Sequence, residues 1–104
     1  MRKKRYKLMM LERNRYSVFF DSLAMCCNCG SMYQPTKHEI FEGRNRQNSM
    51  RYGFVIPLCL NCHRQLQNDI EFNNKWKIKA QDYFENNYGT REDFIKIFRI
   101  NYKD

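Results

Sequence analysis

The sequence predicts a small α+β domain in which short strands come first and helices follow. Three observations support this prediction. Two Cys-x-x-Cys pairs separated by 29 residues lie in the first 62 positions. Short segments rich in β-branched and aromatic residues lie around these pairs, as is typical of strands. From about residue 63 onward, apolar residues recur with helical spacing instead. A length of 104 residues corresponds to a single domain, 1–104.

The chain begins with a strongly basic segment. Its positive residues are Arg2, Lys3, Lys4, Arg5 and Lys7. We expect residues 1–11 to form a flexible basic arm that becomes helical towards its end and can contact phosphate groups. Residues 16–20, with the sequence Tyr-Ser-Val-Phe-Phe, follow this arm and end at Asp-Ser. Their composition predicts the first short strand.

Two further strands are predicted around a polar segment. The first covers His38–Phe41, and the second covers Phe54–Leu58, where Pro57 indicates an edge position or the end of the strand. Residues 42–51 between them have no apolar pattern, so we expect a loop. The arginines of this loop give it phosphate-binding chemistry. They are Arg44, Arg46 and Arg51.

The last forty residues predict helices. Apolar residues at spacings near 3.6 form a broad stripe, and Gly89 ends it. The stripe consists of Ile70, Phe72, Trp76, Ala80, Tyr83 and Phe84. Thr90 with Asp93 three positions later is a weakened capping box, which predicts a final short helix. We expect the aromatic residues of the stripe to form the core.

The two cysteine pairs predict a structural zinc site. A two-residue gap lets both thiolates of a tight turn point at one ion, so Cys26, Cys29, Cys59 and Cys62 together provide four tetrahedral ligands. A reducing cytoplasm keeps such thiols available for metal. Because a domain of this size buries little apolar surface, zinc binding is expected to supply much of its folding free energy. The fifth cysteine, Cys27, is expected to be a half-buried bystander.

The charge of the chain favours a polyanionic partner. Nineteen Lys and Arg against 11 Asp and Glu give +8, and four thiolates on one Zn²⁺ reduce this to about +6. No apolar run approaches the roughly 20 residues of a membrane span, and the basic start is not followed by an apolar stretch typical of an export signal. We therefore expect a cytoplasmic protein without a membrane segment.

The order of these features resembles a known nuclease motif. A strand carrying a histidine, a basic loop, a second strand and a helix beginning with a histidine are similar to the HNH, or ββα-metal, nucleases. The run from Leu11 to Tyr102 most resembles the phage-borne HNH proteins that include the recombination-enhancement (Ref-type) nucleases. The residues that carry the resemblance are Arg15-Tyr16-Ser17, Cys26-x-x-Cys29, His38-Glu39-Ile40-Phe41-x-Gly43, Arg46-x-x-Ser49-x-x-Tyr52-Gly53, Pro57-Leu58-Cys59-x-x-Cys62-His63, Ala80-Gln81-x-x-Phe84-Glu85, Phe94, Ile97-Phe98 and Asn101-Tyr102.

The resemblance implies a zinc-stapled HNH-like domain of phage or mobile-element origin, active in the cytoplasm of the host cell. The implied activity is cleavage of DNA phosphodiesters with Mg²⁺ or Mn²⁺, and a recombination protein is a further implied partner. In the motif's usual form, a metal-binding residue precedes a histidine base. Here the pair is His38-Glu39. Either His38 is the base and Glu39 binds metal, or the roles are reversed; the pKa of imidazole favours His38 as base.

The remaining positions of the motif match unevenly. His63 matches the last histidine and is the expected ligand of the catalytic metal. Glu71 lies eight residues later, and an uninterrupted helix would place it on the same broad face as a second ligand. The middle asparagine of the motif has no clear counterpart, although Asn45 and Asn48 lie in the expected loop.

Two other functions stay open at this point. One is a DNA-binding module with the same fold and no catalysis, which the carboxylate at the base position and the unplaced asparagine favour. The other is a small phage protein that acts on a host protein. The sequence favours no particular oligomeric state.

Overall fold

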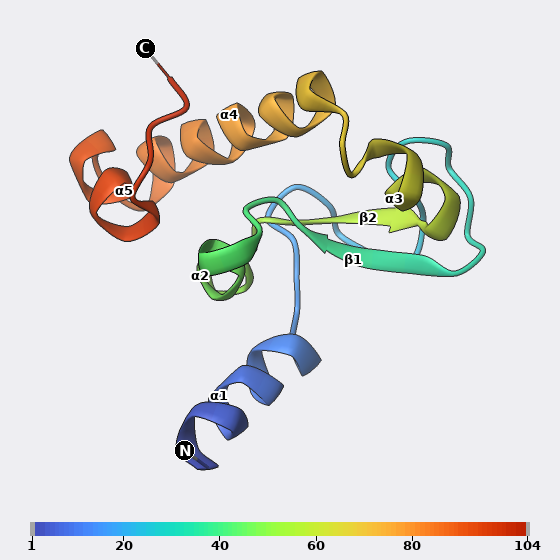
Figure 1. Cartoon of the computed structure of the whole chain (residues 1–104), viewed down its shortest axis with the longest axis horizontal. Helices are drawn as coiled ribbons and strands as arrows, with labels where there is room; N and C mark the ends of the chain where they lie inside the picture. The colour runs from blue at the N-terminus through green and yellow to red at the C-terminus, as the bar shows by residue number, and fades with distance from the viewer. Residues whose placement is uncertain (1, 104) are drawn as a thin grey trace. The chain divides into compact units, whose positions relative to one another are not determined.

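The computed structural model describes residues 2–103. The chain forms two compact units, Met1–Arg64 and Gln65–Asp104. Figure 1 shows the order of the elements along the chain. They are α1 (Arg2–Arg13), β1 (Pro35–Glu39), the 3₁₀ turn η1 (Gly43–Asn45), α2 (Arg46–Tyr52), β2 (Val55–Cys59), α3 (Leu60–Leu66), α4 (Ile70–Asn87) and α5 (Arg91–Phe98). The predicted class, α+β with short strands before C-terminal helices, is confirmed.

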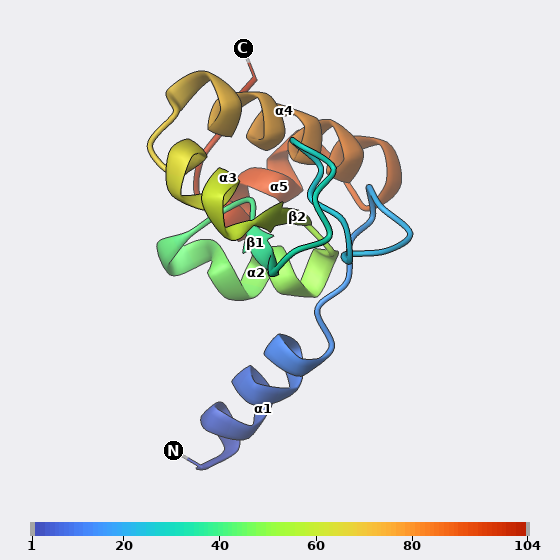
Figure 2. The same ribbon diagram turned by 90° about the vertical axis from the view of Figure 1, so that its right-hand side faces the viewer.

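A two-stranded antiparallel sheet is the centre of the first unit. β1 pairs with β2 so that His38 lies opposite Ile56 and Pro35 lies opposite Cys59. Figure 2 views the two strands nearly end-on. All five residues of β2 are buried, including Pro57. Both strands were predicted, but β1 begins three residues earlier than expected and ends at Glu39. The register places the start of β1 beside the second cysteine pair and its end beside the start of β2.

The polar segment 42–51 is helical, which corrects the prediction of a loop. The turn η1 and helix α2 occupy it, and α2 buries Ser49 and Met50. The Ser49 hydroxyl donates to the Phe41 carbonyl at 2.8 Å and accepts from the Phe41 amide at 3.0 Å. Because α2 has such a narrow buried face, its sequence carries no apolar periodicity that would predict a helix.

Residues 16–20 form no strand, which corrects a second prediction. The Val18 amide donates to the Gly53 carbonyl at 2.9 Å, and the Tyr16 hydroxyl donates to the Arg51 carbonyl at 2.8 Å. The Phe19 amide turns back to the Ser17 hydroxyl. A Cβ at Gly53, whose φ is +75°, would lie 2.5 Å from the Tyr16 ring. Glycine at position 53 therefore permits this close approach and also ends α2.

The segment expected as a flexible arm forms helix α1. Its C-terminal end is held by ion pairs within the first unit. Arg46 donates to Glu12 at 2.8 Å and to Glu39 at 3.1 Å, and Arg15 donates to the same Glu39 oxygen at 3.1 Å. The hydrogen bond from Arg46 holds the pKa of Glu12 below its usual value, and the positive charges of Arg46 and Arg15 add to this effect. These contacts join the end of α1 to β1 and to the start of α2.

The helix expected from about His63 is interrupted. α3 ends at Leu66, and Asp69 caps a new helix by accepting from the Phe72 amide at 2.9 Å. The Asn73 side chain donates to three carbonyls of the turn, those of Leu66, Gln67 and Asp69, at 3.1, 3.2 and 2.7 Å. Polar caps of this kind end one helix and begin the next without a glycine or proline.

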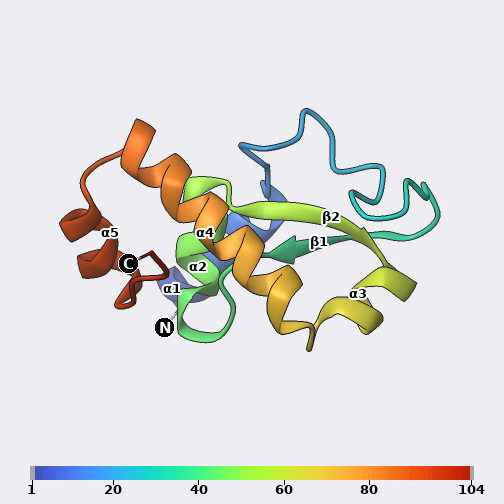
Figure 3. The ribbon, with the colours of Figure 1, turned by 90° about the horizontal axis from the view of Figure 1, so that it is seen from above.

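The second unit contains α4 and α5 (Figure 3), and aromatic side chains join the two helices. The Phe94 ring stacks on Phe98 with centroids 4.5 Å apart, and the Phe84 ring meets Phe94 at 5.5 Å. The predicted capping box is confirmed, since Thr90 and Asp93 exchange both of their side-chain to backbone hydrogen bonds. Of the predicted stripe, Trp76, Ala80 and Phe84 are buried and confirm a core here, whereas Ile70 is 75% exposed and does not belong to it.

Candidate metal centre and imidazole pair

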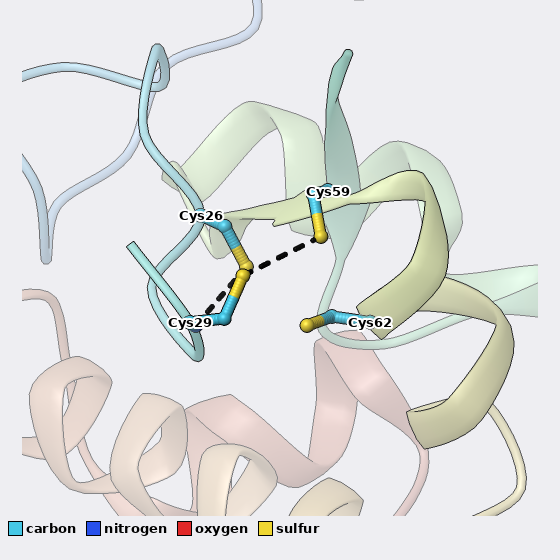
Figure 4. Close-up of side chains that lie close together, drawn as sticks. All are labelled: Cys26, Cys29, Cys59 and Cys62. Carbon is cyan, nitrogen blue, oxygen red and sulfur yellow. Dashed lines mark hydrogen bonds between the residues drawn. The ribbon is translucent and has the colours of Figure 1, made fainter. Parts of the chain in front are cut away.

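The four paired cysteines form one cluster. The sulfur atoms of Cys26, Cys29, Cys59 and Cys62 all lie within 4.8 Å of one another (Figure 4). Four thiolates around zinc at about 2.3 Å have sulfur atoms about 3.8 Å apart. The Cys29 and Cys59 sulfurs lie 3.6 Å apart. The cluster can therefore hold a metal ion such as zinc, as its spacing predicts.

Local backbone geometry builds the first half of this cluster. The Gly30 amide donates to the Cys26 carbonyl at 2.9 Å, and Gly30 closes the turn with a φ of +78°. The Cys29 amide points at the Cys26 sulfur at 3.5 Å. The Cys27 amide donates to the Pro57 carbonyl of β2 at 2.8 Å, so this turn is attached directly to the second strand. Cys27 is half-buried and is not one of the four.

The second half comes from the junction of β2 and α3. Cys59 is the last residue of β2, and Cys62 lies in the first turn of α3; both are buried. The Asn28 side chain donates to the Cys62 sulfur at 3.3 Å. Although burial opposes it, hydrogen bonds from the Cys59, Cys29 and Asn28 backbone lower the pKa of Cys26 to about 6.

The pKa of Cys62 is shifted in the opposite direction, upward. The hydrogen bond from the Asn28 side chain lowers the pKa of Cys62. Burial and the neighbouring thiols Cys59, Cys29 and Cys26 raise this pKa by more, so that it is about 12. Without a cation, the cluster thus concentrates negative charge at Cys26 and keeps a proton at Cys62. A metal ion compensates four thiolates at once, so metal binding near neutral pH releases protons.

The structure brings the two histidines of the chain together. His38 is buried on β1, and His63 is half-buried on α3, one residue after Cys62. Their ring centroids lie 5.2 Å apart, and the ring planes meet at 75°. Both residues belong to the first unit, where β1 pairs with β2 and β2 leads directly into α3. The cysteine cluster at this junction therefore also positions the imidazole pair.

Glu39 is held away from this pair. Successive residues of a strand point to opposite faces, so the side chain of Glu39 leaves β1 on the face opposite to that of His38. There its carboxylate accepts from Arg15 and from Arg46, each at 3.1 Å. Its contacts are those of a structural ion-pair network, and the structure does not bring it to His63.

Another carboxylate, which sequence reasoning passed over, lies beside the pair. Glu42 Oε1 is 3.5 Å from His38 Nε2, and the Glu42 side chain is 60% exposed. Glu42 precedes the turn η1, four residues after His38. The four-residue spacing was visible in the sequence, but the segment was expected to be a loop that binds phosphate, so its acidic residue received no role.

The expected nucleic-acid contacts divide into two kinds. Arg44 on η1 and Arg51 on α2 are exposed. Arg46 is bound to Glu12 and Glu39. The structure thus places two of the three arginines at the surface and the third in the network that anchors α1.

Glu71 and the asparagines occupy separate places. Glu71 is exposed in the first turn of α4, in the second unit, so the continuous helix that would have put it on one face with His63 does not exist. Asn45 is buried at the start of α2, and its side-chain oxygen accepts from Asn48 at 3.3 Å.

The net positive charge lies in the first unit. Residues 1–64 contain 12 Lys and Arg against 4 Asp and Glu, whereas residues 65–104 contain 7 of each kind. The formal charges are therefore +8 and 0. The unit that carries the cysteine cluster and the imidazole pair is thus the one with a net charge. In the described part of the chain, no helix combines the length and apolar character needed to cross a membrane.

No protein-family model, no curated protein and no solved structure matches this chain.

Proposed function

We propose that the protein is a divalent-metal-dependent endonuclease of the HNH type that hydrolyses DNA phosphodiesters. In this proposal Zn²⁺ at the four cysteines is structural, and the imidazole pair is the reactive centre. The observation that carries the proposal is the 5.2 Å separation of the His38 and His63 rings at the end of the strand pair. The formal charge of the same unit, +8 without metal and about +6 with four thiolates on one Zn²⁺, supports a nucleic-acid substrate.

The sequence left Glu39 as either a base or a metal ligand, and its contacts argue against both roles. A carboxylate bound by two guanidinium groups is a poor base and a poor metal ligand, because it would have to give up both ion pairs first. The hydrolytic work is therefore assigned to His38 and His63. Two imidazole rings whose centroids lie 5.2 Å apart could share one divalent ion, and such an ion would neutralise charge on the phosphate and lower the pKa of bound water.

The proposed reaction is hydrolysis of a phosphodiester bond by water. His38 and His63 fix the position from which a water oxygen attacks phosphorus. A new P–O bond forms as the bond to the leaving sugar oxygen breaks, and the proton lost by water ends on that oxygen. The products are a phosphate monoester and a free hydroxyl group. Arg44 and Arg51, both exposed, would hold flanking phosphates.

Plasmid nicking tests this proposal. Purified protein is incubated with supercoiled DNA and Mg²⁺, Mn²⁺ or Zn²⁺, and the same assay is run with His38→Ala and Lys37→Ala. Lys37 is the exposed neighbour of His38 on β1 and is the matched control. We expect nicking by the parent protein and by Lys37→Ala and none by His38→Ala. Equal nicking by all three would remove His38 from the reaction.

A non-catalytic DNA-binding module is the second candidate. The observation that favours it is the engagement of Glu39, the residue at the motif's base position, by Arg15 and Arg46. Mobility-shift assays separate the two functions. DNA binding that is equal in the parent and in His38→Ala, with no nicking under any metal, would establish the binding module instead.

A further inference from the structure

We propose that a groove between α1 and α2 binds an unpaired DNA strand, whose bases stack on Tyr6 and Tyr16 and whose phosphates contact Lys7 and Arg51. The inference deepens the proposed function and rests on it for the choice of DNA, but it is tested by binding and not by cleavage. The groove has a volume of about 530 Å³, within the range of ligand sites. All of its lining residues belong to the first unit.

The groove is built by the way α1 is anchored. Tyr6 and Met10 are four residues apart on α1, so they lie on one face of the helix. Arg46, the first residue of α2, donates to Glu12 at 2.8 Å and holds the C-terminal end of α1 beside α2. Arg51, in the last turn of α2, then lines the same groove as Tyr6.

Tyr16 is held in place before any ligand binds. Its hydroxyl donates to the Arg51 carbonyl at 2.8 Å. Its ring lies so close to Gly53 that an added Cβ there would be 2.5 Å from it. Even so, Tyr16 is 46% exposed and lines the groove. An aromatic ring that is already fixed loses little conformational freedom when a base stacks on it, which favours binding.

The accessible part of the groove is aromatic and polar. Met10 and Leu11 are half-buried and Met50 is buried, so these aliphatic side chains form its floor. The exposed lining residues are Tyr6, Lys7, Asn14, Tyr16 and Arg51. None of the lining residues is acidic. Aromatic rings beside cationic side chains are the combination by which proteins hold single-stranded nucleic acids.

The same features argue against other occupants. A second copy of the chain would bring another unit with a net positive charge against Lys7 and Arg51, which repels it. An acidic amphipathic peptide would match the charge but needs accessible aliphatic surface, and here that surface is largely the covered floor. In a DNA duplex the bases are paired and stacked on one another, so the tyrosines reach them only after the strands open.

Binding of matched probes tests the groove. Zinc-loaded protein, without added Mg²⁺ or Mn²⁺, is titrated into a labelled oligothymidylate, an abasic strand with the same number of phosphates, and a duplex of the same length. The variants are Tyr6→Ala and, as the matched control, Tyr33→Ala. Tyr33 is 74% exposed in the same unit and does not line the groove. Alanine favours helix, so α1 is retained, and circular dichroism checks this.

We expect the parent to bind oligothymidylate more tightly than the abasic strand. Tyr6→Ala should lose roughly 5- to 100-fold in affinity for oligothymidylate, because stacking on one aromatic side chain contributes a factor of that order. Its affinity for the abasic strand and for the duplex should stay unchanged, and Tyr33→Ala should match the parent with all three probes. Tyr6→Phe, which keeps the ring, should bind oligothymidylate as the parent does.

Three results would overturn the proposal. The first is equal affinity of the parent for oligothymidylate and the abasic strand. The second is an equal loss in Tyr6→Ala for both of these probes, which would show that charge or the position of α1 matters and that stacking does not. The third is binding of a labelled glutamate-rich amphipathic peptide that depends on Tyr6 while oligothymidylate binding does not, which would assign the groove to a protein partner.

The failure of this inference can be told apart from the failure of the proposed function. Oligothymidylate binding that depends on Tyr6, in a protein that never nicks plasmid DNA, would establish the groove and remove the nuclease. Nicking that His38→Ala abolishes, in a protein that binds oligothymidylate and the abasic strand equally, would retain the nuclease and remove the groove.

Discussion

Replacement of Cys59 by serine should remove a defined share of the stability of the first unit. Structural zinc contributes about 10–16 kcal/mol to small domains, which is roughly 2.5–4 kcal/mol for each of four thiolates. The ion also closes the chain between Cys29 and Cys59, 30 residues apart. A cross-link over a loop of that length is worth about 3.6 kcal/mol in the chain-entropy model. Both routes give a loss of about 3–4 kcal/mol.

This loss is large for a small unit. A change of 1 kcal/mol shifts the melting temperature of a 60–100-residue domain by about 4–8 °C, so Cys59→Ser should lower it by roughly 15–30 °C. The matched control is Cys27→Ser. Cys27 is half-buried, lies outside the four-sulfur cluster and contacts Pro57 through its backbone amide, which serine keeps. Its replacement should cost under about 1 kcal/mol.

The assay combines two measurements on each protein. Thermal unfolding is followed by circular dichroism, and thiolate coordination is followed by the charge-transfer bands of the cobalt-substituted cluster. We expect Cys59→Ser to weaken the bands, since three thiolates remain, and to lose stability together with them, and Cys27→Ser to keep both. A Cys59→Ser protein that melts within a few degrees of the parent, or a Cys27→Ser protein that loses the bands, would refute the assignment of the four ligands.

Two further predictions concern charge. Replacing both Arg44 and Arg51 by alanine should weaken DNA binding and reduce the slope of log affinity against log salt concentration by about 1–2. Replacing Lys75 and Lys96 by alanine removes the same charge from the neutral second unit and should change this slope less. Equal effects of the two double replacements would exclude a localised interface. A hydrogen bond from Arg91 lowers the pKa of Glu85 in the folded protein. The stability that this interaction contributes is therefore complete above the usual carboxyl pKa of about 4.5 and is lost as the pH falls through the lowered pKa. The melting temperatures of the parent and Glu85→Gln, followed by the single tryptophan, should therefore differ at pH 7 and converge towards pH 3; a constant difference would contradict this role.

The metal cluster could be predicted from the sequence because its geometry is local. Each Cys-x-x-Cys turn presents two sulfurs by itself, and the strand pairing then has to bring only two turns together. The proximity of His38 and His63 follows from the same pairing, since His63 adjoins Cys62 and His38 lies opposite Ile56, three residues before Cys59. Two local turns and one antiparallel strand pairing therefore determine both the cysteine cluster and the proximity of the histidines.

The conformation of other segments depends on contacts with distant residues, which composition does not reveal. Residues 16–20 have the composition of a strand, but the Val18 amide bonds to the carbonyl of Gly53 in a tight approach that only glycine at position 53 allows. Helix α2 was taken for a loop because its buried face is small and includes the polar Ser49. The proximity of Glu42 to His38 was not predicted for the same reason, since it depends on the turn that begins this helical segment.

The arginines around Glu39 have a consequence for how DNA would reach the imidazole pair. Glu39 follows His38 on β1, and through Arg46 it is linked to Glu12 near the end of the basic helix α1. The carboxylate at the motif's base position thus fixes the helix next to the strand that carries His38. Removing its charge by Glu39→Gln should loosen the end of α1 and weaken DNA binding, while the cobalt bands of the cysteine cluster stay unchanged. Loss of nicking with DNA binding intact would return Glu39 to the reactive centre and reverse this assignment.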